Sequence, residues 1–101
     1  MSEFYAPVDP DLLRRERAKA RELRASQWWK RRIADGICYY CRRSVGRRAL
    51  TMDHQVPLGR GGRSTRGNVV PSCKECNTNK KALVPLEWKA YLERLHDSST
   101  D

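Results

Sequence analysis

Four cysteines in two closely spaced pairs are the first residues of this chain whose types and spacing could do chemistry. Two residues separate the cysteines within each pair, and 31 residues separate the pairs, which are Cys38 with Cys41 and Cys73 with Cys76. Four thiolates in this arrangement suit a tetrahedral Zn²⁺ ion with every position closed, which is a structural site. Unligated buried or redox-active thiols are the alternative. The zinc interpretation predicts that residues 38–76 fold as one unit with the ion.

A second group of residues between and beside these pairs could hold another metal and move a proton. Asp53 and His54 are adjacent at the end of a predicted strand, and Asn77 directly follows the last cysteine. If the zinc brings these segments together, oxygens of Asp53 and Asn77 can bind a hard cation of the Mg²⁺ type. His54 beside it could take a proton from water, and the metal would stabilise the pentacovalent phosphate. Alternatively, a lone histidine is structural or solvated, and Asn77 is an ordinary helix-surface residue.

The order of these residues resembles the HNH endonuclease family. The pattern D-H-x-x-P-x-x-x-G-G begins at Asp53, an isolated asparagine follows, and C-x-x-C-N-x-x-K begins at Cys73, with the other C-x-x-C upstream. The resemblance covers about residues 38–81 and is closest to the branch with a four-cysteine zinc and a ββα-metal (His-Me finger) core. Members of this family cut nucleic-acid phosphodiesters with one divalent metal. The resemblance therefore implies a metal-dependent endonuclease.

The resemblance also implies a role for each polar residue of the core. Asp53 takes the place of the metal-binding acid, and His54 that of the general base. Asn68 takes the place of the central asparagine, which orders the loop and helps to hold the catalytic histidine. Asn77 stands where many members have a last histidine, and members with asparagine there use it as the second metal ligand. An oxygen ligand at this place favours Mg²⁺ or Mn²⁺. Asn68 could otherwise simply cap a turn.

Basic residues in and after the Gly/Arg-rich loop are predicted to contact nucleic-acid phosphates. They are Arg60, Arg63, Arg66, Lys80 and Lys81. A glycine-rich loop such as residues 59–67 can lie close to a phosphate backbone. Lys80 matches the trailing basic residue of the family, and Gly61 and Gly62 match its paired glycines. Solvated surface charges are the alternative.

The charge of the whole chain points to the same kind of partner. There are 21 Lys and Arg residues against 12 Asp and Glu, a formal net charge of +9. Such an excess favours a polyanion, because basic groups near phosphates release condensed counterions. We expect double-stranded DNA, with a dimer or a protein partner if both strands are cut. A non-catalytic, zinc-stabilised nucleic-acid-binding module is the main alternative, and the positive charge disfavours a protein-binding zinc knuckle.

Helices on both sides of two short strands are expected to position these residues. Asp9 and Pro10 predict the start of a helix that runs over residues 11–34 and ends before Gly36. Strands are predicted at residues 49–53 and 68–71. Ser72 with Glu75 predicts a capping box for a helix over residues 73–83, and a last helix is expected over residues 86–95. Of Trp28 and Trp29, one is expected in the core, and base stacking is the alternative for these rings.

The predicted fold is a small α+β domain, a ββα-metal finger with a structural four-cysteine zinc and a helix on either side. We divide the chain into a basic helical extension (residues 1–36), a nuclease core with the C-terminal helix (37–96) and a frayed tail (97–101). No apolar run is long enough to span a bilayer, and the first residues lack the features of a secretory signal. We therefore expect an intracellular, cytoplasmic protein. Small enzymes of the family are frequent in phages and mobile elements, which suggests such a source.

Overall fold

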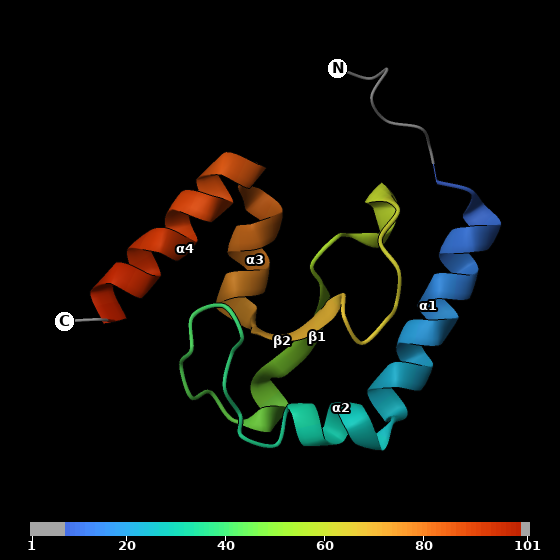
Figure 1. Ribbon diagram of the computed structural model, residues 1–101, viewed down its shortest axis with the longest axis horizontal. Coiled ribbons are helices and arrows are strands. Elements are labelled where there is room, and N and C mark those ends of the chain that lie inside the picture. Colours follow the sequence, from blue (N-terminus) through green and yellow to red (C-terminus); the bar gives the residue numbers. More distant parts are fainter. Residues whose placement is uncertain (1–7, 100–101) are drawn as a thin grey trace. The chain divides into compact units, whose positions relative to one another are not determined.

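The computed structural model, which describes residues 8–99, consists of helices and one short pair of strands (Figure 1). The elements in chain order are α1 (Pro10–Ala25), α2 (Gln27–Arg32), η2 (Arg47–Ala49), β1 (Leu50–His54), η3 (Leu58–Arg60), β2 (Val69–Cys73), α3 (Lys74–Ala82) and α4 (Pro85–Ser99). The chain divides into two compact units. The first unit is Met1–Arg32 with Met52–Val70, and the second is Ile33–Thr51 with Pro71–Asp101.

The two strands pair in a two-stranded antiparallel sheet, as the sequence predicted. β1 lies one residue later than expected, and β2 continues past the predicted end at Pro71 to Cys73. Proline is tolerated here because each strand of a two-stranded sheet has an outer edge that needs no donor. Every residue of β2 is buried, whereas β1 contains buried, half-buried and exposed residues. His54 is thus the last residue of β1, and Cys73 is the last residue of β2.

The N-terminal helix begins as predicted but is broken at Ser26. The Asp9 carboxylate accepts a hydrogen bond from the Asp11 amide at 2.9 Å, and Pro10 is the first helical residue. The single helix predicted over residues 11–34 is wrong, because Ser26 adopts an extended conformation between α1 and α2. Its hydroxyl donates to the Leu23 carbonyl at 2.6 Å and accepts from the Trp29 amide at 3.2 Å. A serine that bonds the backbone in both directions competes with the helical ladder.

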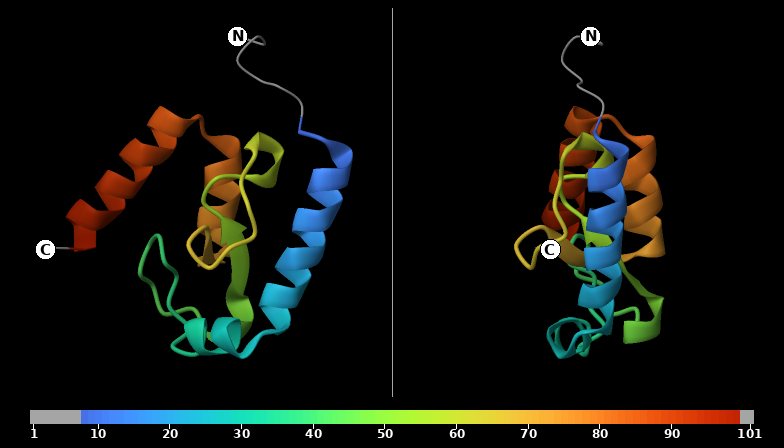
Figure 2. Two further views of the ribbon diagram at one scale, coloured as in Figure 1. Left: turned by 45° about the vertical axis from the view of Figure 1, so that its right-hand side comes forward. Right: turned by 90° about the vertical axis from the view of Figure 1, so that its right-hand side faces the viewer.

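The first unit packs α1 against the loop between β1 and β2, residues 55–68. Figure 2 shows α1 beside this loop in the same unit. Ala20 and Trp29 are buried, at 3% and 4% exposure, together with Val69 of β2. This confirms that one of the two neighbouring tryptophans belongs to the core. The other, Trp28, is half-buried, and the guanidinium of Arg66 lies 5.3 Å from its ring centroid.

The second unit holds the first cysteine pair against α3 and α4. Gly36 has φ +71°, as a left-handed turn requires, and a Cβ there would lie 2.8 Å from the Gly46 Cα atom. Figure 1 shows α3 and α4 meeting at residues 83–84. The Trp88 ring of α4 contacts Tyr40, which is buried, with 5.1 Å between ring centroids, and stacks on Tyr91 at 5.4 Å.

The two C-terminal helices, α3 and α4, differ from the prediction in the residues at which they start and end. The predicted cap at Ser72 is wrong: β2 includes Ser72, so α3 starts later and Cys73 is its cap, with its sulfur accepting from the Cys76 amide at 3.5 Å. α4 continues to Ser99 instead of ending at residue 95. The last two residues of the predicted frayed tail lie outside the described part of the chain. His96 of α4 is exposed, and its Nε2 atom lies 3.1 Å from the Tyr40 carbonyl oxygen.

None of the helices within residues 8–99 combines the length and the apolar character that crossing a membrane requires.

Candidate functional site

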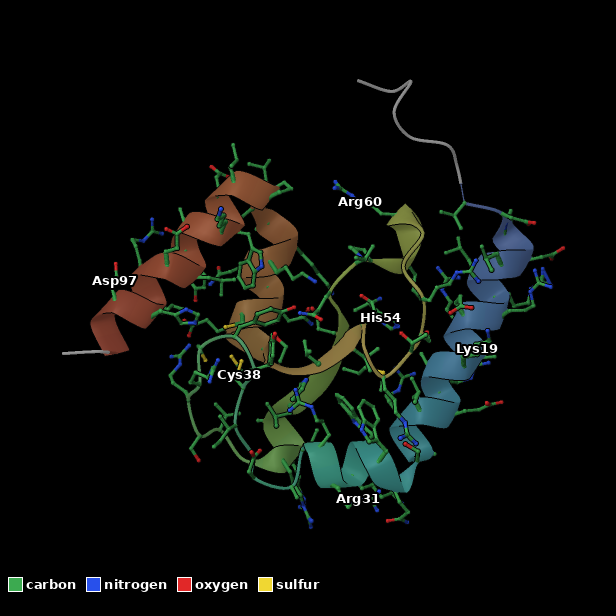
Figure 3. All side chains as sticks on the ribbon, in the orientation of Figure 1. Lys19, Arg31, Cys38, His54, Arg60 and Asp97 are labelled. Atoms are coloured by element: carbon green, nitrogen blue, oxygen red, sulfur yellow. The ribbon has the colours of Figure 1, made fainter. Side chains whose placement is uncertain are left out.

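The four cysteines of the two pairs meet in the second unit, as their spacing predicted. All four Sγ atoms lie within 4.8 Å of one another, and those of Cys41 and Cys73 are 3.8 Å apart. Three of the cysteines are buried and Cys41 is half-buried, and none forms a disulfide. Figure 3 shows sulfur atoms gathered beside Cys38, at the base of α3. Cys73 at the end of β2 and Cys76 in α3 stay close together because β2 runs directly into α3.

The spacing of these sulfurs fits a zinc ion. Four sulfurs at about 2.3 Å from one tetrahedral ion lie about 3.8 Å from each other, far beyond the roughly 2.05 Å of a disulfide. Burial raises the pKa of Cys73, and burial together with the charge of Cys38 raises that of Cys76. Gathering several thiolates in this place is therefore unfavourable by itself, and a divalent cation would offset that repulsion. The cluster could hold a zinc ion.

Hydrogen bonds donated to the sulfurs of Cys38 and Cys41 also favour a metal site at the cluster. The Cys38 sulfur accepts from the Cys73 amide at 3.3 Å, and the Cys41 sulfur accepts from the Arg43 Nε at 3.2 Å. Burial raises the pKa of Cys41, but its hydrogen bonds with Arg43 outweigh this effect and lower the pKa to about 7. Arg43 is held in turn by Glu75, 3.1 Å away. Donors of this kind stabilise thiolates and orient them as ligands.

His54 ends β1 in the first unit and is half-buried. Figure 3 shows it inside the curve of the loop that follows β1. Its Nε2 atom lies 3.0 Å from the hydroxyl oxygen of Ser64, a buried residue of that loop. The strand therefore sets the position of the imidazole, and the loop supplies a polar partner for one ring nitrogen.

Asn68 ties the two ends of the same loop together. Its side-chain oxygen accepts from the Val56 amide at 2.9 Å, while its side-chain nitrogen lies 3.1 Å from the Val56 carbonyl and 2.8 Å from the Arg63 carbonyl. The Gln55 amide also donates to the Asn68 carbonyl at 2.8 Å. These bonds fix the chain on both sides of the loop, which is what a loop-ordering asparagine requires. A direct catalytic part for Asn68 stays a prediction.

Glu16 of α1 is a buried carboxylate that the sequence analysis missed. It is 2% exposed, and its Oε1 atom accepts a hydrogen bond from the Ser64 amide at 2.6 Å. Its Oε2 atom lies 3.2 Å from Lys19 and 3.5 Å from Arg63. The hydrogen bond from Ser64 lowers the pKa of Glu16. In the sequence, Glu16 stands out only as an acid within a run of basic residues. That pattern does not predict Ser64, 48 residues away, as its partner.

The two predicted ligands of a catalytic metal, Asp53 and Asn77, belong to different units. Asp53 is 9% exposed in β1 of the first unit. Asn77 is half-buried on α3 of the second unit, directly after a cysteine of the cluster. Their predicted partnership as metal ligands stays a prediction.

The predicted phosphate-contacting residues have different surroundings. Arg60 is exposed, and Figure 3 shows it extending from η3 away from α1. Arg63 is paired with Glu16 and Arg66 lies over Trp28, so part of each guanidinium is already engaged. Lys80 and Lys81 follow on α3; the Lys80 ammonium lies 5.9 Å from the Tyr40 ring centroid, and Lys81 is exposed. The contact of these residues with DNA stays a prediction.

Part of the chain matches a model of a known protein family. Residues 38–83 match the family model described as HNH endonuclease. We refer to this matched segment as the HNH domain below. The resemblance inferred from the sequence is confirmed over it, and the order β1, β2, α3 is compatible with a ββα-metal fold. A search of the curated proteins found no match.

The HNH domain contains most, but not all, of the groups described above. His54, Ser64, Asn68 and the four cysteines lie inside it, whereas α1, α2 and α4 lie outside. Glu16 is therefore a buried acid that contacts the HNH domain from a helix beyond its limits. The match to the family model links residues 38–83 to nucleases in general, and α1 lies outside the matched residues.

Proposed function

We propose that this protein is a metal-dependent endonuclease that hydrolyses phosphodiester bonds of DNA. The match of residues 38–83 to the HNH endonuclease family carries the proposal. The position of His54 adds support, because a strand end and a hydrogen-bonded loop hold its imidazole in one place. A base that must meet one particular water benefits from such fixed placement.

His54 acts as the general base in the proposed reaction. Its imidazole takes a proton from water as the water oxygen attacks phosphorus in line with the 3′ oxygen. The bond from phosphorus to the 3′ oxygen breaks, that oxygen takes a proton from the solvent, and the products carry 5′-phosphate and 3′-hydroxyl ends. A bound divalent metal supplies positive charge near the phosphate and the departing oxygen. We propose the carboxylate of Asp53 and the amide oxygen of Asn77 as its ligands, since hard oxygen donors suit Mg²⁺ or Mn²⁺.

The four-cysteine cluster has a separate, structural part in this proposal. With four sulfur ligands its zinc would have no open position for water or substrate, so it would stabilise the fold without taking part in hydrolysis. Free cysteines suit the reducing interior of a cell, and we propose an intracellular role on that ground.

Double-stranded DNA is the substrate that the charge favours. The chain carries a formal net charge of +9, and Arg60 and Lys81 are exposed on the HNH domain. We propose that Arg60, Arg63, Arg66, Lys80 and Lys81 contact its phosphates. One active site cuts one strand, so cutting both strands would take a dimer, a partner protein or two encounters.

Cleavage of an end-labelled DNA duplex in Mg²⁺ or Mn²⁺ tests the proposal. The wild type should yield products with 5′-phosphate ends, and His54→Ala should yield none while still retarding the duplex in a gel. His96→Ala is the matched control, because it removes the only other histidine of the chain and should leave cleavage intact. Equal cleavage by wild type and His54→Ala would remove His54 as the base.

A non-catalytic, zinc-stabilised nucleic-acid-binding module is the second candidate. The four-cysteine cluster favours it, because such a staple with a basic surface is sufficient for binding. Retarded duplex without any product, for the wild type in both metals, would support this module and contradict the nuclease.

A further inference from the structure

Ser64 lies between His54 and helix α1. It belongs to the loop between η3 and β2 and is 7% exposed. Its hydroxyl oxygen is 3.0 Å from His54 Nε2 and 2.7 Å from the main-chain carbonyl oxygen of Glu16. All three residues belong to the first unit. A single hydroxyl therefore links the histidine of the HNH domain to a helix outside it.

The direction of these two hydrogen bonds follows from the number of hydrogens. A carbonyl oxygen only accepts, and two oxygens 2.7 Å apart repel each other unless a hydrogen lies between them. The single hydroxyl hydrogen of Ser64 is thus directed to Glu16. What remains on Ser64 is acceptor capacity, so His54 Nε2 must be the donor. A neutral imidazole with its hydrogen on Nε2 has its lone pair on Nδ1.

We propose that Ser64 is a positioning residue that holds His54 as the Nε2–H tautomer, with α1 supplying the acceptor that orients the Ser64 hydroxyl. The proposal rests on the proposed role of His54 as general base. Under that role, Nδ1 is the ring nitrogen that takes the proton from water. Without the bond to Ser64, the ring can rotate and exchange tautomers, so only a fraction of molecules would present Nδ1.

Glu16 fixes Ser64 through its backbone as well as its hydroxyl. The carboxylate accepts from the Ser64 amide at 2.6 Å while the carbonyl of the same residue accepts from the hydroxyl. Lys19 and Arg63 offset the buried negative charge. Such double attachment leaves the Ser64 oxygen little freedom, and a partner with little freedom restricts the imidazole in turn.

A purely structural role is the competing explanation. In that case the bonds between Glu16 and Ser64 only dock α1 on the loop, and the contact with His54 is incidental. The two explanations differ in what they require of the imidazole. Positioning requires one tautomer and a hydrogen-bonded Nε2–H in the free protein, whereas docking alone requires neither.

Nitrogen-15 NMR of the histidine side chains in the zinc-loaded full chain tests the proposal. The chain has only two histidines, so a His96→Gln sample assigns both spectra. The spectra are recorded about 1.5 pH units above the pKa of about 6.5 of a free histidine side chain, and the ring proton of His54 should lie on Nε2. That proton should exchange slowly in wild type and in Thr65→Ala, an exposed neighbour that serves as control. In Ser64→Ala the slow proton should be lost, while the His96 signals stay unchanged.

Either of two results would overturn the proposal. One is a wild-type His54 with its proton on Nδ1, which needs no variant and stands even if Ser64→Ala does not fold. The other is a folded Ser64→Ala protein whose His54 signals match those of wild type. Cleavage is a second readout: Ser64→Ala should lower kcat about ten- to a hundredfold with little change in KM. If the wild type cleaves nothing, the proposed function fails while the NMR still decides the tautomer.

Discussion

Replacing Gly62 by alanine should open the loop that carries Ser64 and Asn68. A Cβ at this position would lie 1.8 Å from the Val56 carbonyl oxygen and 2.9 Å from that of Pro57. Ordinary contacts between carbon and oxygen begin at about 3.3 Å. Both obstacles are backbone atoms, so no side-chain rotation relieves the clash, and the chain at residues 56–57 must move by more than an ångström.

The hydrogen bonds that hold this turn set the size of the effect. The Gly62 amide donates to the Pro57 carbonyl at 2.9 Å, and Val56 exchanges two bonds with the Asn68 side chain at 2.9 and 3.1 Å. Each contributes about 1 kcal/mol net, so breaking two or three of them lowers the free energy of unfolding by about 2–3 kcal/mol. Gly59→Ala is the matched control, because its Cβ would meet nothing within 4 Å. Its effect should stay within about 0.5 kcal/mol.

Urea unfolding of the zinc-loaded proteins, followed by tryptophan fluorescence, measures both effects. Trp28 and Trp29 belong to the same unit as the loop, so they report on its unfolding. A Gly62→Ala protein within about 0.5 kcal/mol of Gly59→Ala would refute the packing argument for this turn.

Three further predictions concern other parts of the molecule. Cys73→Ser should lose zinc and the cooperative unfolding of the second unit; a folded, zinc-free variant, seen by metal analysis and circular dichroism, would contradict the structural zinc. The lowered pKa of Glu16 means that its stabilisation is present above the unfolded value of 4.5 and is lost as the pH falls through the folded value. Thermal unfolding from pH 6 to 3 should therefore show a shallower loss of stability in Glu16→Gln than in wild type, and parallel curves would argue against this linkage. Trp88→Ala should cost about 2–3 kcal/mol by removing the contact with Tyr40, as measured by urea unfolding, and a neutral result would mean that α4 is not anchored there.

The cysteine cluster and the strands could be predicted because their signals are local. Two residues between paired cysteines fix the thiolates of each pair on one ion, and Asp9 with Pro10 marks a helix start by its own chemistry. Family resemblance then located His54 and Asn68 within the pattern. Such features need only a few neighbouring residues to be recognised.

The rest depended on contacts between distant residues or on local hydrogen bonds that compete with regular secondary structure. Glu16 and Ser64 are 48 positions apart, and nothing in either neighbourhood indicates the pairing that joins α1 to the loop. Ser26 resembled an ordinary residue in a helix-forming stretch until its hydroxyl was found to bond the backbone on both sides. The cap of α3 was misplaced by one residue because pairing with β1 extends β2 through Pro71. In each case a tertiary or competing hydrogen bond outweighed local preference.

Cleavage of supercoiled plasmid is the measurement that tests the nuclease proposal most directly. Zinc-loaded wild type, His54→Ala and His96→Ala would be incubated with plasmid in Mg²⁺ and in Mn²⁺. We expect nicked or linear plasmid from wild type and His96→Ala, and intact supercoiled plasmid from His54→Ala. Intact plasmid with every protein and both metals, together with retarded migration in a gel, would contradict the nuclease and leave a zinc-stabilised DNA-binding protein.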